Sequence, residues 1–526
     1  MIKGFVPLDY IIFVAYLVLS VLIGVIFVKD QKTIEDYFLA GRSMGYVPVA
    51  ISIIAALFSG ISYLGAPAEV YSHDLSFMLI MVSFLIATPV TTLLFVPFFY
   101  NLKLYSAYEY LEKRFSVEVR TISSLLFITR VLLWLGLATY APALALSAVT
   151  GFPLWGTILL TGVLTTIYTA LGGMKAVIWT DVFQFFVLFG GMLLIVLIAL
   201  SKIPDGLSGA LALAKAGGRM RLFDFTLDPT VRTSFWALVI GGAVVNLVQL
   251  ATDQVTVQRY MTTTSLKEAK KSLWLKLALT FPVVGLFYFS GVILYAFYRN
   301  AGDPLVTHAI SKADQILPYF VVTELPNGLP GVMIAAIYAA TMSTTSSGIN
   351  SLTTCTLVDL CQRVFGLKTS EQRMLSLARW ITIVYGGFVI LLAFVVSKLG
   401  SLLEASILVL GMVGGPLLGI FLLGMLSRRA NSPGVMIGWG LGVVAVALVG
   451  FGKSIGPIMP GTLGNGILFA SNISFLWFGV VGTGVTLIAG YVASLMFPSP
   501  TDAQLNGLVI NRKSSDLTEQ PALDRA

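Results

Sequence analysis

Long apolar runs recur along this 526-residue chain and constrain its fold more than any other feature. A membrane span needs roughly 20 mainly apolar residues. Only 11% of the residues are charged, against about 25% in soluble domains, so the chain needs a bilayer as its solvent. We therefore expect an all-α membrane protein with thirteen transmembrane helices, near residues 8–28, 47–70, 75–100, 121–149, 153–171, 178–201, 233–252, 272–298, 329–362, 376–398, 403–426, 433–451 and 473–497.

An odd number of spans favours one leading helix, two five-helix halves and two trailing helices. Two halves with an odd number of spans must be inverted relative to each other, as in many secondary transporters. A single transmembrane domain would then cover residues 1–500. Its parts would be the leading helix 8–28, a first repeat 47–201, a second repeat 233–426 and trailing helices within 433–497, followed by a polar cytoplasmic tail 501–526.

The basic residues predict the orientation. With the N-terminus outside, most of the 33 Lys and Arg residues fall in cytoplasmic connections, as the positive-inside rule requires. We expect a multi-pass protein of the cell (inner) membrane with an outside N-terminus and a cytoplasmic C-terminus. This distribution also accounts for the net charge of +8, so no nucleic-acid partner is expected.

The side chains of common enzyme sites are scarce. The chain has two cysteines, Cys355 and Cys361, and two histidines, His73 and His308. No His, Cys or carboxylate cluster indicates a catalytic centre or a transition-metal site. The nearest approach to a nucleotide-binding loop, the GKS at 452–454, lacks a glycine five residues earlier. We therefore expect neither an enzyme nor transport driven directly by ATP.

Two of the expected spans differ from ordinary membrane helices. One contains AALFSGIS at 55–62, and the other contains GGAVVNLVQ at 241–249. Small, hydroxyl and amide residues at corresponding places in two halves predict discontinuous helices around a site at mid-membrane. Asn246 and Gln249 then become candidates for substrate contact. The alternative is that both amides form hydrogen bonds between helices.

Among the expected spans, the one with the most polar side chains contains STTSSGIN at 343–350. On a helix Ser343, Ser346, Ser347 and Asn350 share one face. Hydroxyls and freed carbonyls suit a hard cation such as sodium, although Ser and Thr also promote close helix packing. Asp181, at the start of another span, is either functional or an interfacial carboxylate favoured by the helix dipole.

Arg130 and Trp134 lie one helical turn apart in the third main span. The arginine could attract an anionic substrate on which Trp134 stacks, or it could snorkel or pair with a carboxylate. Phe77 and Met81 belong to an apolar stripe that lines either a pocket or a packing interface.

The chain resembles the sodium/solute symporter family over about residues 8–450. The motifs are DYFLAGR at 36–42, YTALGGMKAVIWTD at 168–181, VQRY at 257–260 and STTSSGIN at 343–350. The resemblance implies a LeuT-like five-plus-five inverted repeat that binds sodium through the carbonyls of Ala55, Phe58 and Ala340 and the hydroxyls of Ser343 and Thr344. As in bacterial sialic acid symporters, it also implies a second sodium at Asp181, Ser343, Ser346 and Ser347, hence one or two Na+ per cycle.

Further motifs resemble the branch with the sodium–iodide, multivitamin and monocarboxylate symporters: YAPAL at 140–144, DFTLDP at 224–229 and GPLLG at 415–419. Trp134 stands where sialic acid symporters have an arginine. The resemblance therefore implies sodium-coupled import of a small organic anion by alternating access, with a sialic acid or sugar as the alternative and a passive channel or membrane sensor as a different class. The expected substrate contacts are Leu57, Ser59, Ser62, Phe77, Met81, Trp134, Asn246 and Gln249.

Overall fold

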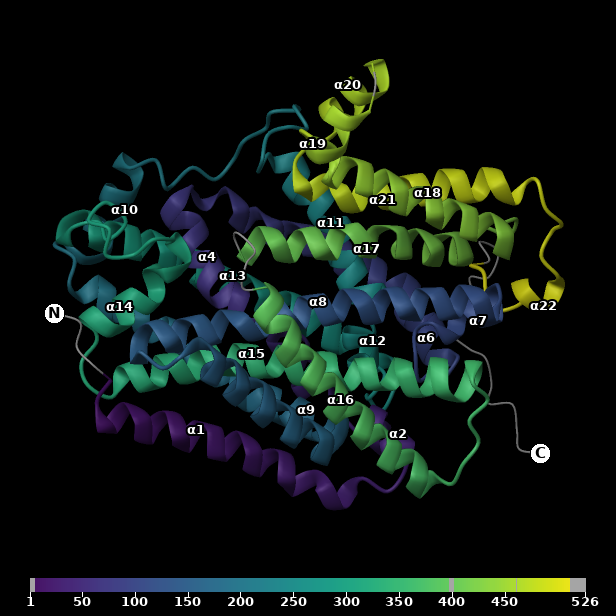
Figure 1. Ribbon diagram of the computed structural model, residues 1–526, viewed down its shortest axis with the longest axis horizontal. Coiled ribbons are helices and arrows are strands. Elements are labelled where there is room, and N and C mark those ends of the chain that lie inside the picture. Colours follow the sequence, from purple (N-terminus) through teal and green to yellow (C-terminus); the bar gives the residue numbers. More distant parts are fainter. Residues whose placement is uncertain (1–4, 397–401, 460, 511–526) are drawn as a thin grey trace.

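The computed structural model describes residues 5–396, 402–459 and 461–510, which form a bundle of helices without a strand. Figure 1 shows α1 along one edge of this bundle and α18 beside α21 along the opposite edge. The end of the expected span 376–398 and residues 511–526 of the expected tail lie outside the described residues.

The α-helices are α1 (Pro7–Ile26), α2 (Ile34–Leu39), α3 (Tyr46–Leu57), α4 (Gly60–Ser72), α5 (Phe84–Val90), α6 (Val96–Asn101), α7 (Glu109–Arg114), α8 (Val117–Thr150), α9 (Leu154–Ser201), α10 (Gly206–Ala216), α11 (Gly242–Leu247), α12 (Gln254–Tyr260), α13 (Leu266–Ala301), α14 (Ile316–Glu324), α15 (Leu329–Thr354), α16 (Glu371–Val396), α17 (Leu402–Leu426), α18 (Ser432–Gly450), α19 (Gly452–Ile455), α20 (Gly461–Ala470), α21 (Phe478–Ser494) and α22 (Asp502–Leu505). The 3₁₀ and π segments are η1 (Phe27–Asp30), η2 (Ala40–Arg42), η3 (Leu75–Ser83), η4 (Thr91–Phe95), η5 (Ala237–Gly241), η6 (Val248–Thr252), η7 (Ala313–Gln315), η8 (Cys355–Val364), η9 (Gly456–Ile458) and η10 (Phe475–Trp477).

The described residues confirm a multi-spanning helical protein. Nine of their helices are long and apolar enough to cross a membrane, or eleven when each of two sharply bent pairs is taken as one span. The exact number of thirteen stays a prediction. The structure differs most from the expected ranges at α9, where 153–171 and 178–201 run together in one element of 48 residues.

Gly173 divides α9 into two arms. An unbroken helix of this length would be about 72 Å long, more than twice the thickness of a bilayer core. Gly173 instead has φ 57° and ψ −161°, a backbone region open essentially to glycine alone. A Cβ atom there would lie 2.8 Å from the carbonyl oxygen of Tyr37. The chain therefore needs a glycine at this kink, and the two expected spans correspond to the two arms of α9.

Two discontinuous helices are confirmed, the first with its break inside the predicted stretch 55–62 and the second with its break beyond the predicted stretch 241–249, which stays helical. The axes of α3 and α4 meet at 62°, across Phe58 and Ser59. The segment Ala237–Thr252 meets Gln254–Met261 at 50°, across Asp253. Each break lies inside an apolar span and leaves backbone groups without their helical partners. Such groups are tolerated at membrane depth only where protein or a cavity surrounds them.

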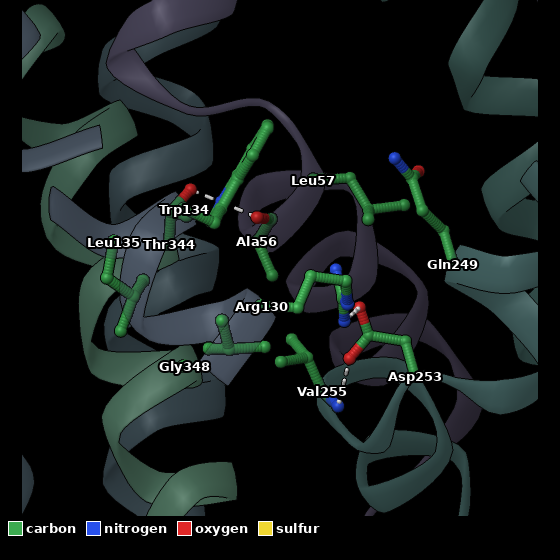
Figure 2. A pocket seen from close by; sticks show the side chains of 11 residues that line it. Ala56, Leu57, Arg130, Trp134, Leu135, Gln249, Asp253, Val255, Thr344 and Gly348 are labelled. Carbon is green, nitrogen blue, oxygen red and sulfur yellow. Dashed lines mark hydrogen bonds and ion pairs between the residues drawn. The ribbon is translucent and has the colours of Figure 1, made fainter. Parts of the chain in front are cut away.

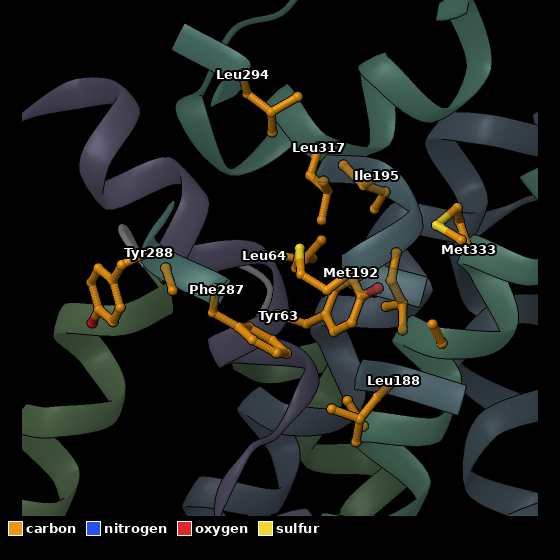
Figure 3. Packing of buried hydrophobic residues seen from close by; sticks show 14 of the residues in the cluster. Tyr63, Leu64, Leu188, Met192, Ile195, Phe287, Tyr288, Leu294, Leu317 and Met333 are labelled. Carbon is orange, nitrogen blue, oxygen red and sulfur yellow. The ribbon is translucent and has the colours of Figure 1, made fainter. Parts of the chain in front are cut away.

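Close aromatic packing covers one side of the first break. The ring of Phe287, from α13, lies 5.5 Å from the ring of Phe58 and 5.3 Å from that of Tyr63. Figure 3 shows Phe287 and Tyr63 among aliphatic side chains such as Leu64, Leu188 and Met192. Because lipid is as apolar as these residues, the close fit itself holds the helices together.

The leading helix α1 is joined to α15 through the buried carboxylate of Asp9. One carboxylate oxygen accepts a hydrogen bond from the backbone of Val6, at 3.0 Å. The other accepts from the backbone N–H groups of Gly328 and Gly331, at 2.9 and 3.0 Å. Asp9 therefore caps the beginnings of two helices, where a negative charge is favoured by the helix dipole.

Residues 501–510, the described part of the expected tail, pack against the bundle. Tyr110 donates from its hydroxyl to the carbonyl of Leu508, at 2.9 Å, and the side chain of Leu508 is buried. The backbone N–H of Ile510 donates to the carbonyl of Met425, at 2.9 Å. This segment therefore contacts both α7 and the end of α17.

Candidate functional site

The first break brings backbone carbonyls of α3 against two hydroxyls of α15. Ser343 Oγ donates to the carbonyl of Ala55 at 2.8 Å, and Thr344 Oγ1 donates to that of Ala56 at 3.0 Å. Both hydroxyls also lie within 3.2 Å of the carbonyl of Ala340. All five residues are buried. The structure thus brings together four of the five residues predicted for the first sodium site and adds Ala56.

These oxygens suit sodium chemically. Each hydroxyl now donates a hydrogen bond to a carbonyl, but it can turn to offer a lone pair to a cation instead. Phe58, the fifth predicted ligand, is half-buried in the break with ψ 85°, so its carbonyl is outside the helical hydrogen-bond ladder of α3. Carbonyls of unwound membrane helices are typical ligands of coupling sodium ions.

A second polar cluster surrounds Asp181 of α9. Asp181 Oδ2 accepts hydrogen bonds from Ser52 Oγ at 2.6 Å and from Arg259 Nη2 at 2.9 Å. Arg259 also donates to Ser52 at 2.8 Å and to the hydroxyl of Ser347. Both partners of this ion pair are fully buried. The other oxygen, Asp181 Oδ1, is buried and has no hydrogen-bond partner within the described part of the chain.

Among the predicted second sodium ligands, Ser347 is linked to Asp181 through Arg259, which donates to both side chains. Ser346 Oγ and Ser347 Oγ both donate to the carbonyl of Ser343, so these three serines form one hydrogen-bonded group on α15. Sequence reasoning missed Ser52 and the role of Arg259. The available signal was the arginine itself, since a buried charge in a membrane segment requires a counterion.

A small cavity of about 40 Å³ lies beside the first oxygen cluster. Of the predicted substrate contacts, it brings together Leu57, Trp134 and Gln249. Figure 2 shows them with the Thr344–Ala56 hydrogen bond and the facing side chains of Arg130 and Asp253. The other lining residues are Val131, Leu135, Val255 and Gly348. The wall is therefore mostly apolar, with its charge concentrated in one pair.

The remaining predicted substrate contacts lie elsewhere. Ser59 caps α4 by accepting from the N–H of Ile61, and Asn246 donates to Ser83 Oγ at 2.6 Å. Phe77 is buried, with its ring stacked near those of Tyr288 and Phe475. Ser62 and Met81 are half-buried. None of these five lines the cavity beside the first oxygen cluster, so their contact with substrate stays a prediction.

Arg130 and Asp253 form a buried ion pair in the cavity wall. Arg130 Nη2 lies 2.6 Å from Asp253 Oδ2, and the two side chains are 4% and 9% exposed. Asp253 also accepts through Oδ1 from the backbone of Val255, at 2.9 Å, and so caps α12. Sequence reasoning singled out Arg130 but not its partner, which lies in the second break.

A further ion-pair network joins α7, α8 and η8 away from the cavity. Arg120 holds Asp359 through Nε and Nη2, at 2.8 and 2.6 Å, and holds Glu112 through Nη1, at 2.7 Å. Partial burial alone would raise the pKa of the Glu112 carboxyl. Hydrogen bonds from Arg363 and Arg120 outweigh that effect and lower this pKa below its ordinary value.

Sequence comparison identifies relatives across most of the chain. The profile of the sodium:solute symporter family matches residues 37–442. Sodium-coupled monocarboxylate transporter 1 of Mus musculus is 39% identical, over 87% of this chain and 76% of that protein. The sodium/iodide cotransporter of Homo sapiens is 37% identical, over 85% and 70% respectively. The sodium-dependent multivitamin transporter of Oryctolagus cuniculus is 34% identical, over 93% and 82%.

Comparison with solved structures agrees. A substrate-bound, outward-open sodium-coupled sialic acid symporter, whose structure reveals a novel sodium site, superimposes with a TM-score of 0.84. That protein is 31% identical, over 94% of this chain and 99% of its own. Mhp1, a nucleobase-cation-symport-1 family transporter, shares the fold with a TM-score of 0.51 at 15% identity. The chain thus has the LeuT-like fold of secondary transporters.

Proposed function

Because this chain belongs to the sodium:solute symporter family, we propose that it imports a small organic anion together with sodium, by alternating access. Members of this family are transporters and not enzymes. The observation that carries the proposal is the pairing of Ser343 and Thr344 with the carbonyls of the broken helix α3. Sodium there would bridge α3 and α15 and so stabilise one arrangement of the two helices.

The first sodium site consists of the carbonyls of Ala55, Phe58 and Ala340 and the hydroxyls of Ser343 and Thr344. The hydroxyls of this set already lie within hydrogen-bond distance of carbonyls on both helices. Sodium binding then needs only hydroxyl rotation and small shifts. Ala56, whose carbonyl accepts from Thr344, is an additional candidate ligand.

A second sodium binds at Asp181 with Ser343, Ser346 and Ser347, which gives two ions per cycle. The buried, unpartnered Oδ1 of Asp181 supports this assignment, since a carboxylate oxygen buried without a donor is costly unless a cation or donor reaches it. Arg259, on the other oxygen, keeps the site from carrying an uncompensated negative charge in the absence of the ion.

The solute is a small monovalent organic anion, such as a monocarboxylate or a vitamin-like carboxylate. The similarity to monocarboxylate, iodide and multivitamin transporters supports an anion. So does a cavity with mostly apolar walls, Leu57, Trp134 and Gln249 at its surface, and an arginine within it. The second candidate is a sialic acid, favoured by the similarity to the sialic acid symporter structure.

The membrane arrangement completes the proposal. The protein lies in the cell (inner) membrane, with the N-terminus outside and the C-terminus in the cytoplasm, as the distribution of basic residues favours. The repeats are residues 47–201 and 233–426. One sharply bent pair of helices in each half, α3 with α4 and Ala237–Thr252 with Gln254–Met261, supports this division.

The test is uptake of radiolabelled solutes into proteoliposomes, with and without an inward sodium gradient. The panel contains pyruvate, lactate, pantothenate, iodide, sialic acid and glucose. Accumulation of an organic anion only with the gradient supports the proposal. Equilibration without accumulation, whatever the sodium gradient, would instead indicate a passive channel.

A further inference from the structure

The cavity wall contains a single positive charge. Of the eleven lining residues that the structure describes, Arg130 alone is cationic and Asp253 alone is anionic. The others are apolar or neutral. A charged solute that enters this cavity therefore meets one guanidinium group. Because Arg130 is buried, water screens its charge only weakly.

The guanidinium of Arg130 is only partly used by the protein. An arginine has five N–H donors on three nitrogens. Arg130 makes its ion pair with Asp253 through Nη2, while its Nε is buried without a partner within the described residues. Asp253, by contrast, uses both oxygens, one for Arg130 and one for the cap of α12.

Arg120 of the same protein is an arginine whose three side-chain nitrogens all have hydrogen-bond partners. Its Nε and Nη2 both bind Asp359, and its Nη1 binds Glu112. Each of its three nitrogens thus has a carboxylate partner, in a location that does not line the cavity. Arg120 is suited to hold α8 and η8 together. Arg130, with one nitrogen engaged, retains donors for a ligand.

We propose that Arg130 is the carboxylate-binding residue of the cavity, and this inference rests on the proposed function. The solute's carboxylate takes the free donors of the Arg130 guanidinium, while Asp253 stays on Nη2 and on the cap of α12. The organic part of the solute then lies against Leu57 and Trp134. A second anionic group on the solute would have no further cation to meet, so the cavity selects monovalent anions.

The position of Arg130 also couples the anion to sodium. Thr344 and Ala56, which are hydrogen-bonded in the first sodium cluster, line the same cavity. With sodium there, the local charges are Arg130, Asp253, one sodium and one anion, which sum to zero. Without sodium, the anion shares a single arginine with Asp253 at a net charge of minus one. Anion affinity should therefore rise when sodium binds.

The test compares propionate with its uncharged isostere propionamide in the full-length protein in proteoliposomes. The variant is Arg130→Gln with Asp253→Asn, which removes both charges together and leaves neither partner unpaired. The matched control is Arg120→Gln with Asp359→Asn, which neutralises a buried pair that does not line the cavity. Sodium binding is followed separately, as the sodium-dependent rise in thermal unfolding temperature of each protein in detergent.

The expected result is a KM for propionate raised roughly 10- to 100-fold in the Arg130 variant, the loss that removal of a charge-assisted hydrogen bond causes. Its sodium-dependent stabilisation should persist, and its preference for propionate over propionamide should vanish. The Arg120 control should keep the wild-type KM and preference. Arg130→Lys should recover part of the affinity, because it restores the charge without the fork of donors.

Two results would overturn the inference while sodium coupling stands. One is a wild-type KM and preference for propionate in the neutral Arg130 variant. The other is equal loss of sodium stabilisation and uptake, without a change of preference, which would make the pair structural. Sodium-driven accumulation of glucose but of no anion by the wild-type protein would overturn both the inference and the anionic part of the proposed function.

Discussion

Ser343 Oγ lies 2.8 Å from the carbonyl oxygen of Ala55, although the two residues are 288 positions apart in the chain. This contact joins the broken helix α3 to the middle of α15, and Thr344 repeats it one residue further along on Ala56. The hydroxyls of two adjacent residues on α15 thus form hydrogen bonds to two adjacent carbonyls of α3 in the candidate sodium site.

Replacement of both Ser343 and Thr344 by Ala should abolish sodium dependence. Two oxygen ligands, each contributing about 1.5 kcal/mol to a bound cation, correspond to a roughly 100-fold loss of sodium affinity. Uptake measured against sodium concentration checks this. Thr353→Ala is the control, because Thr353 lies on the same helix but donates to Ile349. Full sodium dependence in the double variant would exclude the assigned site.

Asp181→Asn should lower the free energy of unfolding by about 3–5 kcal/mol, because it leaves Arg259 buried and charged without its partner. Addition of Arg259→Gln should restore much of that loss. In this double variant the ratio of sodium to solute should fall from two to one. Thermal unfolding in detergent and paired fluxes of ²²Na+ and labelled solute measure the two effects. A ratio that stays at two would remove Asp181 from the ion path.

Gly173→Ala should destabilise the fold by about 3 kcal/mol or more, since the residue has positive φ and a Cβ atom would meet the carbonyl of Tyr37. Gly190→Ala, in the second arm of α9, is the matched control. A Cβ atom at Gly190 meets open space, so that change should stabilise the helix by about 0.5–1 kcal/mol. Opposite signs in the unfolding temperatures of the two variants are the expected outcome.

Lys276→Met should stabilise the protein by about 1–2 kcal/mol. Lys276 is 1% exposed, and its Nζ has no hydrogen-bond partner within the described residues. Its one favourable contact is the ring of Phe84, 3.2 Å from Nζ to the centroid. A charged amine buried without a hydrogen-bond partner or counterion is costly, and a cation–π contact offsets only part of that cost.

The control for Lys276 is Lys271→Met. Lys271 is 46% exposed and pairs with Glu268, so its replacement should change stability by less than about 1 kcal/mol. Unfolding temperatures in the same detergent compare the two. A lower unfolding temperature for Lys276→Met would mean that the buried charge stabilises the fold and is not a cost to it.

The multi-spanning architecture and the first break could be predicted from local sequence, because bilayer thickness fixes the length of an apolar run and backbone breaks need small or polar residues. The second break lies at Asp253, past the predicted stretch 241–249. The two spans that form the arms of α9 could also be predicted, but the kink at Gly173 that joins them could not. That depends on how Gly173 packs against Tyr37, which no local pattern reveals.

The candidate site divides in the same way. The serine face of α15 follows from helical periodicity, and the family resemblance supplied its carbonyl partners. The partners Asp253 for Arg130 and Arg259 for Asp181 could not be predicted, because each pair lies far apart in the chain, at 123 and 78 positions. A sequence shows that a buried charge needs a counterion. It does not show which one the fold brings within 3 Å.

The shared cap at Asp9 has a consequence for biogenesis. The Asp9 carboxylate leaves the ribosome with the first helix. Gly328, from whose N–H it accepts a hydrogen bond, follows 319 residues later. At about 5–20 residues per second, synthesis of that stretch takes roughly 15 s to one minute. During this interval the newly inserted α1 holds a charged side chain without one of its two helix partners. The Asp9 carboxylate therefore gains its hydrogen bonds from Gly328 and Gly331 only after the start of α15 has been synthesised.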